Sequence, residues 1–233
     1  MQRAHALSLS LEEAVVPQLH KILRARIVSC ELAPGQRISE TEIASTYQVS
    51  RQPVREAFIK LAERNLVSIR PQRGTYIRRI SVPDALTARF IREAVEVDLV
   101  RRAVARTSAQ MVATLDAQIL EQQQAARADD PAAFMRLDEA FHRSLARFAD
   151  APAVSEYLDD LNVPMNRVRS ISARQFSPEK LVVQHAAIVD RIRHGDADGA
   201  EAAMRAHLQE FNKDLPKIIA ACPDYFDGSE ALT

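Results

Sequence analysis

Four polar side chains in the second half of the sequence have the types and spacing of a metal site. Asp138 and His142 are four residues apart, and His185 and His207 lie in two later segments. Each lies beside or on an apolar stripe with helical spacing, so all four are expected to point inward from three separate helices. Such helices can converge on a common centre, and imidazole with carboxylate is a donor set suited to zinc, nickel or similar divalent ions.

Spacing alone leaves two interpretations of this set open. Buried polar groups are costly without partners, and a shared ion would satisfy all four. A single inward histidine, however, is usually satisfied within the core, and Asp138 with His142 can form a plain buried hydrogen bond. His194 is interpreted differently, because it precedes Gly195 at an expected helix end, where a histidine favours the negative end of the helix dipole.

A second group of side chains, near residue 50, has the chemistry of nucleic-acid recognition. Arg51, Gln52 and Arg55 lie off the apolar stripe at the start of an expected helix, and Ser50 precedes them. Arginine can bind a guanine edge with two hydrogen bonds, glutamine can do the same for adenine, and an exposed helix start suits phosphate oxygens. Each arginine alone could simply solubilise an exposed face. The set favours DNA because of the elements around it.

The elements expected before residue 80 form a winged helix-turn-helix. Two helices joined by a short turn, the second beginning with a polar patch, have the helix-turn-helix layout. Two short β-prone runs around a turn at 71–74 predict a hairpin, here a wing. Ser39 and Glu42 have the spacing of a capping box at the second helix. The three helices and two strands are expected near residues 11–28, 40–47, 50–65, 66–70 and 75–78.

Every segment after Pro83 has helical periodicity, which predicts an all-α antiparallel bundle of about six helices. Pro164 is expected to kink or split one of them. The fold class is therefore mainly α, with domains at 10–80 and 83–220 and a flexible tail at 221–233. The expected helices lie near residues 83–106, 108–127, 131–149, 152–171, 177–194 and 197–220.

Composition supports a DNA partner and argues against a membrane. The 233 residues carry no net charge, yet residues 1–80 hold 13 Lys and Arg against 7 Asp and Glu, while the remainder holds 18 against 24. A basic block of domain size suits a polyanion. No signal peptide or membrane-spanning run is expected. Cys30 and Cys222 have no metal-type spacing, which is consistent with a reducing cytoplasm.

Residues 14–80 resemble the winged helix-turn-helix of the GntR family. The specific segment is Val49-Ser50-Arg51-Gln52-Pro53-Val54-Arg55-Glu56-Ala57, supported by Leu32-Ala33-Pro34-Gly35, Ile38-Ser39-Glu40 and Arg73-Gly74. Cys30, Arg64-Asn65 and Gln52 depart from the family pattern, and Gln52 affects the expected operator sequence because that position can face bases. The residues expected to contact DNA are Arg37, Glu40, Thr41, Ser50, Arg51, Gln52, Arg55, Arg73 and Gly74.

Residues 84–215 resemble the FCD-type ligand-binding domain of the FadR-like subgroup of this family. The matching pieces are Arg92-Glu93 through Glu96, Asp138-x-x-x-His142, Gln184-His185-x-x-Ile188 and Ala203-Met204-Arg205-x-His207-Leu208. The resemblance implies that Asp138, His142, His185 and His207 bind a divalent ion, zinc first, with nickel or manganese as alternatives. Gln184 stands where many relatives carry an acidic residue.

The resemblance also implies an effector. Four protein ligands on an octahedral ion leave two positions, which in family members a small carboxylate or water fills. Arg92 could pair with the carboxylate, or else form a buried ion pair with Glu96, and Asn166 is a second pocket candidate. We therefore expect a cytoplasmic homodimer that binds a pseudo-palindromic operator as a repressor.

Two other functions are kept as alternatives. A metal with open positions could activate water in a hydrolase-like enzyme, although no general base stands beside the ligands. A DNA-binding protein could instead use the ion only to hold its bundle together. The first alternative predicts turnover, and the second predicts that no metabolite changes operator affinity.

Overall fold

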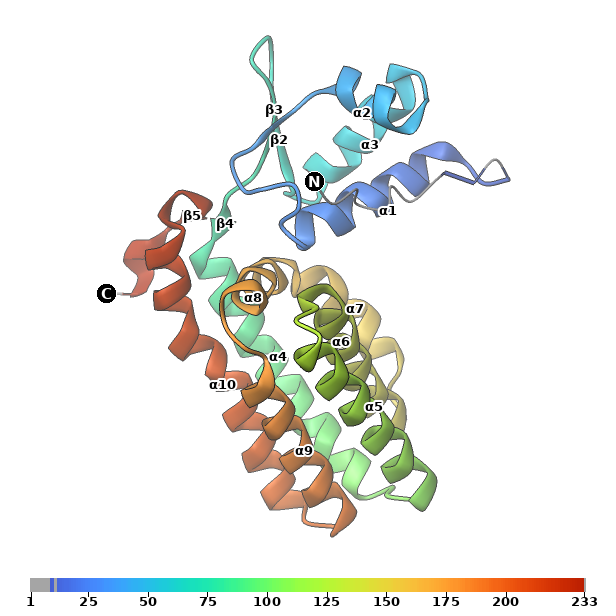
Figure 1. Ribbon diagram of the computed structural model, residues 1–233, viewed down its shortest axis with the longest axis vertical. Helices are drawn as coiled ribbons and strands as arrows, with labels where there is room; N and C mark the ends of the chain where they lie inside the picture. The colour runs from blue at the N-terminus through green and yellow to red at the C-terminus, as the bar shows by residue number, and fades with distance from the viewer. Residues whose placement is uncertain (1–8, 11, 233) are drawn as a thin grey trace. The chain divides into compact units, whose positions relative to one another are not determined.

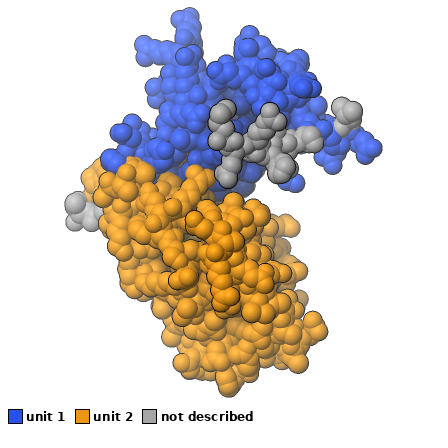
Figure 2. All heavy atoms as spheres, viewed as in Figure 1, with its two compact units in different colours: residues 1–80, 223–227 blue, residues 81–222, 228–233 orange. Residues whose placement is uncertain are grey.

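The computed structural model describes residues 9–10 and 12–232, and the chain divides into two compact units. Unit 1 contains residues up to 80 together with 223–227, and unit 2 contains 81–222 with the residues after 227 (Figure 2). The division falls between Ile80 and Ser81. Each unit has its own apolar core.

Unit 1 holds a helix-turn-helix (Figure 1). Its helices are α1 (Val15–Val28), α2 (Glu40–Tyr47) and α3 (Arg51–Glu63). The Ser39 side chain accepts a hydrogen bond from the Thr41 amide and so caps α2, and the left-handed Gln48 ends that helix. α3 packs against α1 and α2. Leu19, Leu23, Val54 and Phe58 are fully or almost fully buried in this unit.

The wing is a three-stranded antiparallel sheet in the order β1-β3-β2. Its strands are β1 (Arg37–Ile38), β2 (Val67–Arg70) and β3 (Gly74–Ile77). The β2–β3 hairpin closes at the pair Arg70 and Gly74, as the alternating pattern predicts. β1, which pairs with β3, was not predicted, because two residues are too short to show an alternation.

Unit 2 is a bundle of helices (Figure 1). α10 packs against α4, α8 and α9, while α5 packs against α6 and α9. Fully buried apolar side chains such as Leu115, Phe134, Phe141, Ile188 and Met204 form its core. The helices are α4 (Val82–Val104), α5 (Ala109–Arg127), α6 (Pro131–Phe148), α7 (Ala153–Leu161), α8 (Val163–Gln175), α9 (Glu179–Arg193) and α10 (Ala197–Ala221).

The structure has two helices, α7 and α8, where the sequence predicts one. The segment expected at 152–171 divides at Asn162, which ends α7 and begins α8. Pro164 occupies the first turn of α8, where its missing N–H leaves no hydrogen bond unmade. The bundle therefore has seven helices among the described residues, one more than expected.

The C-terminal segment, expected to be a flexible tail, has regular structure over its described residues. β5 (Phe226–Asp227) pairs with β4 (Ile80–Ser81), and short 3-10 helices, η1 (Pro223–Tyr225) and η2 (Ser229–Leu232), flank it. The expectation of a flexible tail rested on turn-forming residues in this segment. The free energy gained by burying Phe226 favours an ordered segment instead. No helix among the described residues combines the length and apolarity needed to cross a bilayer.

Candidate metal centre and nucleic-acid interface

The start of α3 presents an exposed polar surface. Arg51, Gln52 and Arg55 are exposed, and Ser50, also exposed, makes no capping hydrogen bond with its side chain. Arg51 pairs through Nη2 with Glu40 Oε2 at 3.0 Å. Exposed ion pairs are worth little, so this arginine can exchange its carboxylate for a base edge or a phosphate at low cost.

The other predicted DNA contacts lie in the wing and at the start of α2. Arg73 is exposed, and the Tyr76 hydroxyl donates to its backbone carbonyl at 3.1 Å. Gly74 has φ +104°, and a Cβ there would lie 2.8 Å from Nε of Arg37. Gly74 is thus required by backbone conformation and by the close approach of Arg37. Thr41 is exposed in the first turn of α2.

Asp138, His142, His185 and His207 come together in unit 2, and all four are buried. Asp138 and His142 extend from α6, His185 from α9 and His207 from α10. One donor atom from each lies within 4.8 Å of the other three. Nε2 of His207 is 3.2 Å from Nε2 of His185 and 3.3 Å from Nε2 of His142.

Each imidazole has its other nitrogen, Nδ1, beside an oxygen. These oxygens are Gln122 Oε1 at 2.7 Å from His185, Gln184 Oε1 at 3.1 Å from His207, and Glu96 Oε2 at 2.6 Å from His142. The amide nitrogens of Gln122 and Gln184 donate to the Leu137 carbonyl and to Glu210, so their oxygens face the rings. The two amide oxygens accept hydrogen bonds from Nδ1 of His185 and of His207, which is the arrangement that orients metal-binding histidines. Nδ1 of His142 lies close to Glu96 without forming an aligned hydrogen bond.

With Nδ1 as the donor in His185 and His207, their Nε2 lone pairs face each other, and Nε2 of His142 lies beside that of His207. Asp138 Oδ1, 3.7 Å from Nε2 of His185, is buried and has no hydrogen-bond partner. Burial lowers the pKa of His185 to about 3, so the ring is neutral at pH 7. A bound cation would satisfy these donor atoms, and the types of the four residues fit a divalent ion.

Two buried ion pairs surround the donors. Arg92 Nε donates to Glu96 Oε1 at 2.6 Å, which is the alternative that the sequence left open for Arg92. Burial opposes the ionisation of Glu96, but the charge of Arg92 and its hydrogen bond lower the pKa of this carboxyl to about 2. Arg169, a residue that the sequence did not single out, pairs with Asp138 Oδ2.

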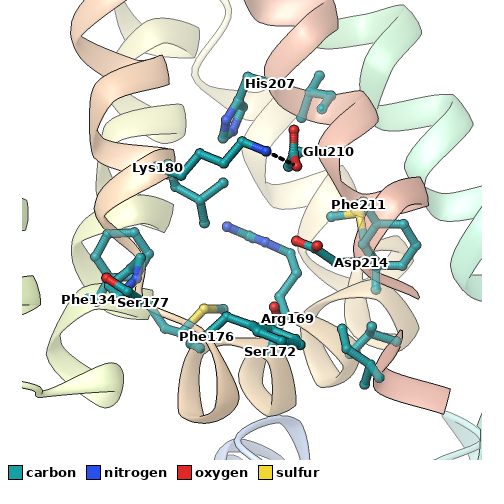
Figure 3. A pocket seen from close by; sticks show the side chains of 18 of the residues that line it. Phe134, Arg169, Ser172, Phe176, Ser177, Lys180, His207, Glu210, Phe211 and Asp214 are labelled. Atoms are coloured by element: carbon teal, nitrogen blue, oxygen red, sulfur yellow. Dashed lines mark hydrogen bonds and ion pairs between the residues drawn. The ribbon is translucent and has the colours of Figure 1, made fainter. Parts of the chain in front are cut away.

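A cavity of about 230 Å³ adjoins this cluster inside unit 2. Of the four donors, His207 lines the cavity, as do Arg92 and Arg169 from the neighbouring ion pairs. Figure 3 shows Lys180 paired with Glu210 at the same cavity. Asn166 is not among the lining residues. Its Oδ1 accepts a hydrogen bond from Nη1 of Arg169 at 3.2 Å, so its role would be exerted through that arginine.

Comparison with known proteins assigns both units. The family profile described as "Bacterial regulatory proteins, gntR family" matches residues 17–77, and the FCD domain profile matches residues 88–210, more than half of the chain. The chain belongs to the GntR family. Its members are transcription regulators rather than enzymes, so the hydrolase alternative is set aside.

Relatives over nearly the full length support this assignment. The HTH-type transcriptional repressor RspR of Escherichia coli K12 is 38% identical over 215 residues, covering 92% of this chain and 94% of RspR. A probable D-xylose utilization operon transcriptional repressor of Paenarthrobacter nicotinovorans is 26% identical, covering 84% and 87%. This GntR protein is therefore a DNA-binding transcription regulator with an FCD domain, a class of domain that binds small effectors.

Solved structures share the fold. E. coli McbR/YncC superposes with a TM-score of 0.75 at 20% identity, covering 88% of this chain and 98% of that one. A putative GntR regulator from Rhodococcus sp. RHA1 has a TM-score of 0.71 at 24% identity, with the same coverage. At these identities the likeness concerns the fold alone.

Sequence reasoning on this GntR regulator missed the groups that surround the four donors. Gln122 lies on α5 and contacts His185, and Arg169 lies on α8 and contacts Asp138, so both are far along the chain from the donors they contact. A weak signal exists for Arg169, because it is spaced four residues from Met165 and one from Val168, both buried and both lining the cavity. Gln122 also carries a signal, because it follows Leu115 and Ile119 at helical spacing on the buried face of α5, where a glutamine is unusual.

Proposed function

We propose that this GntR regulator is a repressor whose operator affinity is controlled by a small carboxylate bound at a divalent metal centre. Asp138, His142, His185 and His207 would hold the ion, which we expect to be zinc, with nickel or manganese as alternatives. When bound, the ion supplies a positive centre for a carboxylate oxygen. The observation that carries the proposal is the set of three facing Nε2 atoms and the unpartnered Asp138 oxygen beside a cavity.

The charge of the buried groups favours an anionic effector. Asp138 and Glu96 are paired with Arg169 and Arg92, so these four charges cancel, and the three histidines are flanked by two neutral amides. A divalent ion added to this neutral set leaves positive charge in a buried site. An anion bound in the cavity offsets that charge.

The DNA-binding half of the proposal rests on the exposed start of α3. Arg51, Gln52 and Arg55, which are exposed, would read base edges, while Ser50 and Arg73 would contact phosphates. Two copies related by a two-fold axis would read a pseudo-palindromic operator. RspR and the P. nicotinovorans relative are both described as repressors, which supports repression rather than activation.

The change in operator affinity that the effector causes is measured by a coupling free energy between the two binding sites. The effector must bind more tightly to one state of the regulator than to the other, and by reciprocity DNA must change effector affinity by the same factor. A coupling of about 1–3 kcal/mol corresponds to about 5–150-fold.

The test is fluorescence anisotropy with a labelled duplex from the protein's own promoter region and a scrambled duplex of equal length. Zinc-loaded protein should prefer the promoter, small carboxylates should change that affinity, and chelation should abolish the change. A preference that no acid alters, in protein that unfolds on chelation, would support the alternative of a purely structural ion. Sedimentation at the concentrations used tests the dimer.

A further inference from the structure

We infer that Arg169, rather than Arg92, binds the effector carboxylate, and that the effector is a monocarboxylate with a compact apolar body. The inference rests on the proposed function and specifies the class of ligand that the same cavity accepts. It depends on which cation extends into the cavity, and on which residues make up the rest of the wall.

Arg92 is already committed. Its side chain is 2% exposed, and its Nε lies 2.6 Å from Glu96 Oε1. The other oxygen of Glu96 lies 2.6 Å from Nδ1 of His142, so moving Arg92 would also disturb the orientation of a metal-site histidine. At 2% exposure the guanidinium of Arg92 is also less accessible to a ligand than that of Arg169, whose side chain is 14% exposed.

Arg169 has the reach and the free donors. Figure 3 shows its side chain extending into the middle of the cavity. Its hydrogen bonds run from Nη2 to Asp138 and from Nη1 to Asn166, and a guanidinium has five N–H donors. Because Arg169 also contacts Asp138, a carboxylate that binds this arginine lies next to the donor cluster. Arg169 thus places the anion at the metal centre.

The other cations of the cavity wall have partners. Lys180 pairs with Glu210, and Lys217 Nζ lies 3.2 Å from Asp214 Oδ1. Both lysine side chains are more than 60% exposed, so they offer no buried cation to a second carboxylate. A second carboxylate set against the apolar part of the wall would lose its water without gaining such a partner, which favours a ligand with one negative charge over a dicarboxylate.

Most of the remaining wall is apolar. The residues that carry the argument are Phe134, Met165, Val168, Phe176, Leu181 and Phe211. Phe176, at the end of α8, is 40% exposed, and Lys217 Nζ lies 6.0 Å from its ring centroid. Hydroxyl groups placed against such a wall would lose their hydrogen bonds to water, whereas an alkyl or aryl body gains from burial. The hydroxyl groups of Ser172 and Ser177, which also line the cavity, could hydrogen-bond to one polar substituent of the ligand.

The ligand class is tested by calorimetry on the full-length, zinc-loaded protein. Benzoate and hexanoate are compared with succinate, which adds a carboxylate, with glycerate, which replaces the apolar body by hydroxyls, and with benzamide, which removes the charge. Benzoate or hexanoate should bind about tenfold or more tightly than the other three, and operator binding should respond in the same order.

The role of Arg169 is tested with Arg169→Gln and Arg169→Lys, using Arg174→Gln on the same helix as the control. Both Arg169 variants should weaken benzoate binding by about tenfold or more, and the control by less than about twofold. Phe176→Ala should weaken benzoate binding but leave acetate binding unchanged. Zinc content and thermal unfolding are measured for each variant, so that a lost ion or a lost fold is distinguished from a lost contact.

Three results would overturn the inference in distinguishable ways. Tighter binding of succinate or glycerate would refute the ligand class while leaving the proposed function intact. Full benzoate affinity in zinc-loaded Arg169→Gln would refute the role of Arg169. Binding of none of the acids to zinc-loaded protein would refute the inference and the proposed function together.

Discussion

The two units use arginine and carboxylate pairs in opposite ways. In unit 1, Arg51 and Glu40 form a pair whose arginine side chain is 67% exposed. In unit 2, Arg92 and Glu96 form a pair that is almost completely buried. The exposed pair can dissociate cheaply when a nucleic acid arrives, while the buried pair holds its neighbours in one geometry. The pair on the proposed DNA-binding surface is exchangeable, and the pair beside the proposed metal centre is preorganised.

The largest effect should come from removing inward donors. We expect His142→Ala combined with His207→Ala to reduce bound metal from about one ion per chain to background, because two of four donors are lost. Elemental analysis after gel filtration measures this. His194→Ala, which removes an exposed histidine on the same domain, should retain the ion. Stoichiometric metal in the double variant would show that these histidines are not ligands.

A direct comparison of the two ion pairs should give the next largest effect. Glu96→Ala leaves Arg92 buried without its partner, so we expect a loss of about 3–5 kcal/mol in the free energy of unfolding. Glu40→Ala should cost less than about 1 kcal/mol. Urea denaturation in the presence of a chelator removes any contribution of metal. Equal losses in the two variants would contradict the contrast drawn between the units.

Single arginines of α3 should have intermediate effects, confined to DNA. Arg51→Ala and Arg55→Ala should each weaken operator binding by about 1–3 kcal/mol, with little change in stability. Anisotropy titrations measure the affinity, and Arg143→Ala, which removes an exposed arginine of unit 2, is the matched control. If the control loses as much affinity, the α3 arginines contribute only general charge.

The smallest expected effect is a difference in stability between variants of two serines of unit 1 that precede helices. Ser39 caps α2 through the Thr41 amide, whereas the Ser50 side chain makes no capping bond. Ser39→Ala should therefore cost about 1 kcal/mol of stability and Ser50→Ala only a few tenths. Thermal unfolding measures both. A larger cost at Ser50 would mean that its hydroxyl supports the helix, and would weaken its assignment to phosphate.

Local patterns predicted most of the fold. Ser39 and the apolar spacing gave α2 its observed bounds, and the alternating residues around Gly74 predicted the hairpin. The family and the mainly helical fold class are confirmed. β1, β4 and β5 were missed because pairs of residues carry no periodic signal, and their pairing depends on contacts distant in sequence.

The candidate site was predictable only in its innermost part. Asp138 and His142 share a helix face, so their spacing is visible in the sequence. Gln122, Glu96 and Arg169 reach the site from other helices, and only tertiary packing shows which of many polar residues do so. The assignments of ligands, effector contacts and DNA contacts stay predictions.

The pairing of β4 with β5 affects how the protein matures. Unit 1 includes residues 223–227, and both Ile80 and Phe226 are buried. A ribosome must therefore translate the whole helical bundle of unit 2 before the strand Phe226–Asp227 of unit 1 is available. A nascent chain stalled after the wing would expose Ile80 to solvent, and a head domain produced by itself needs a substitute for that strand.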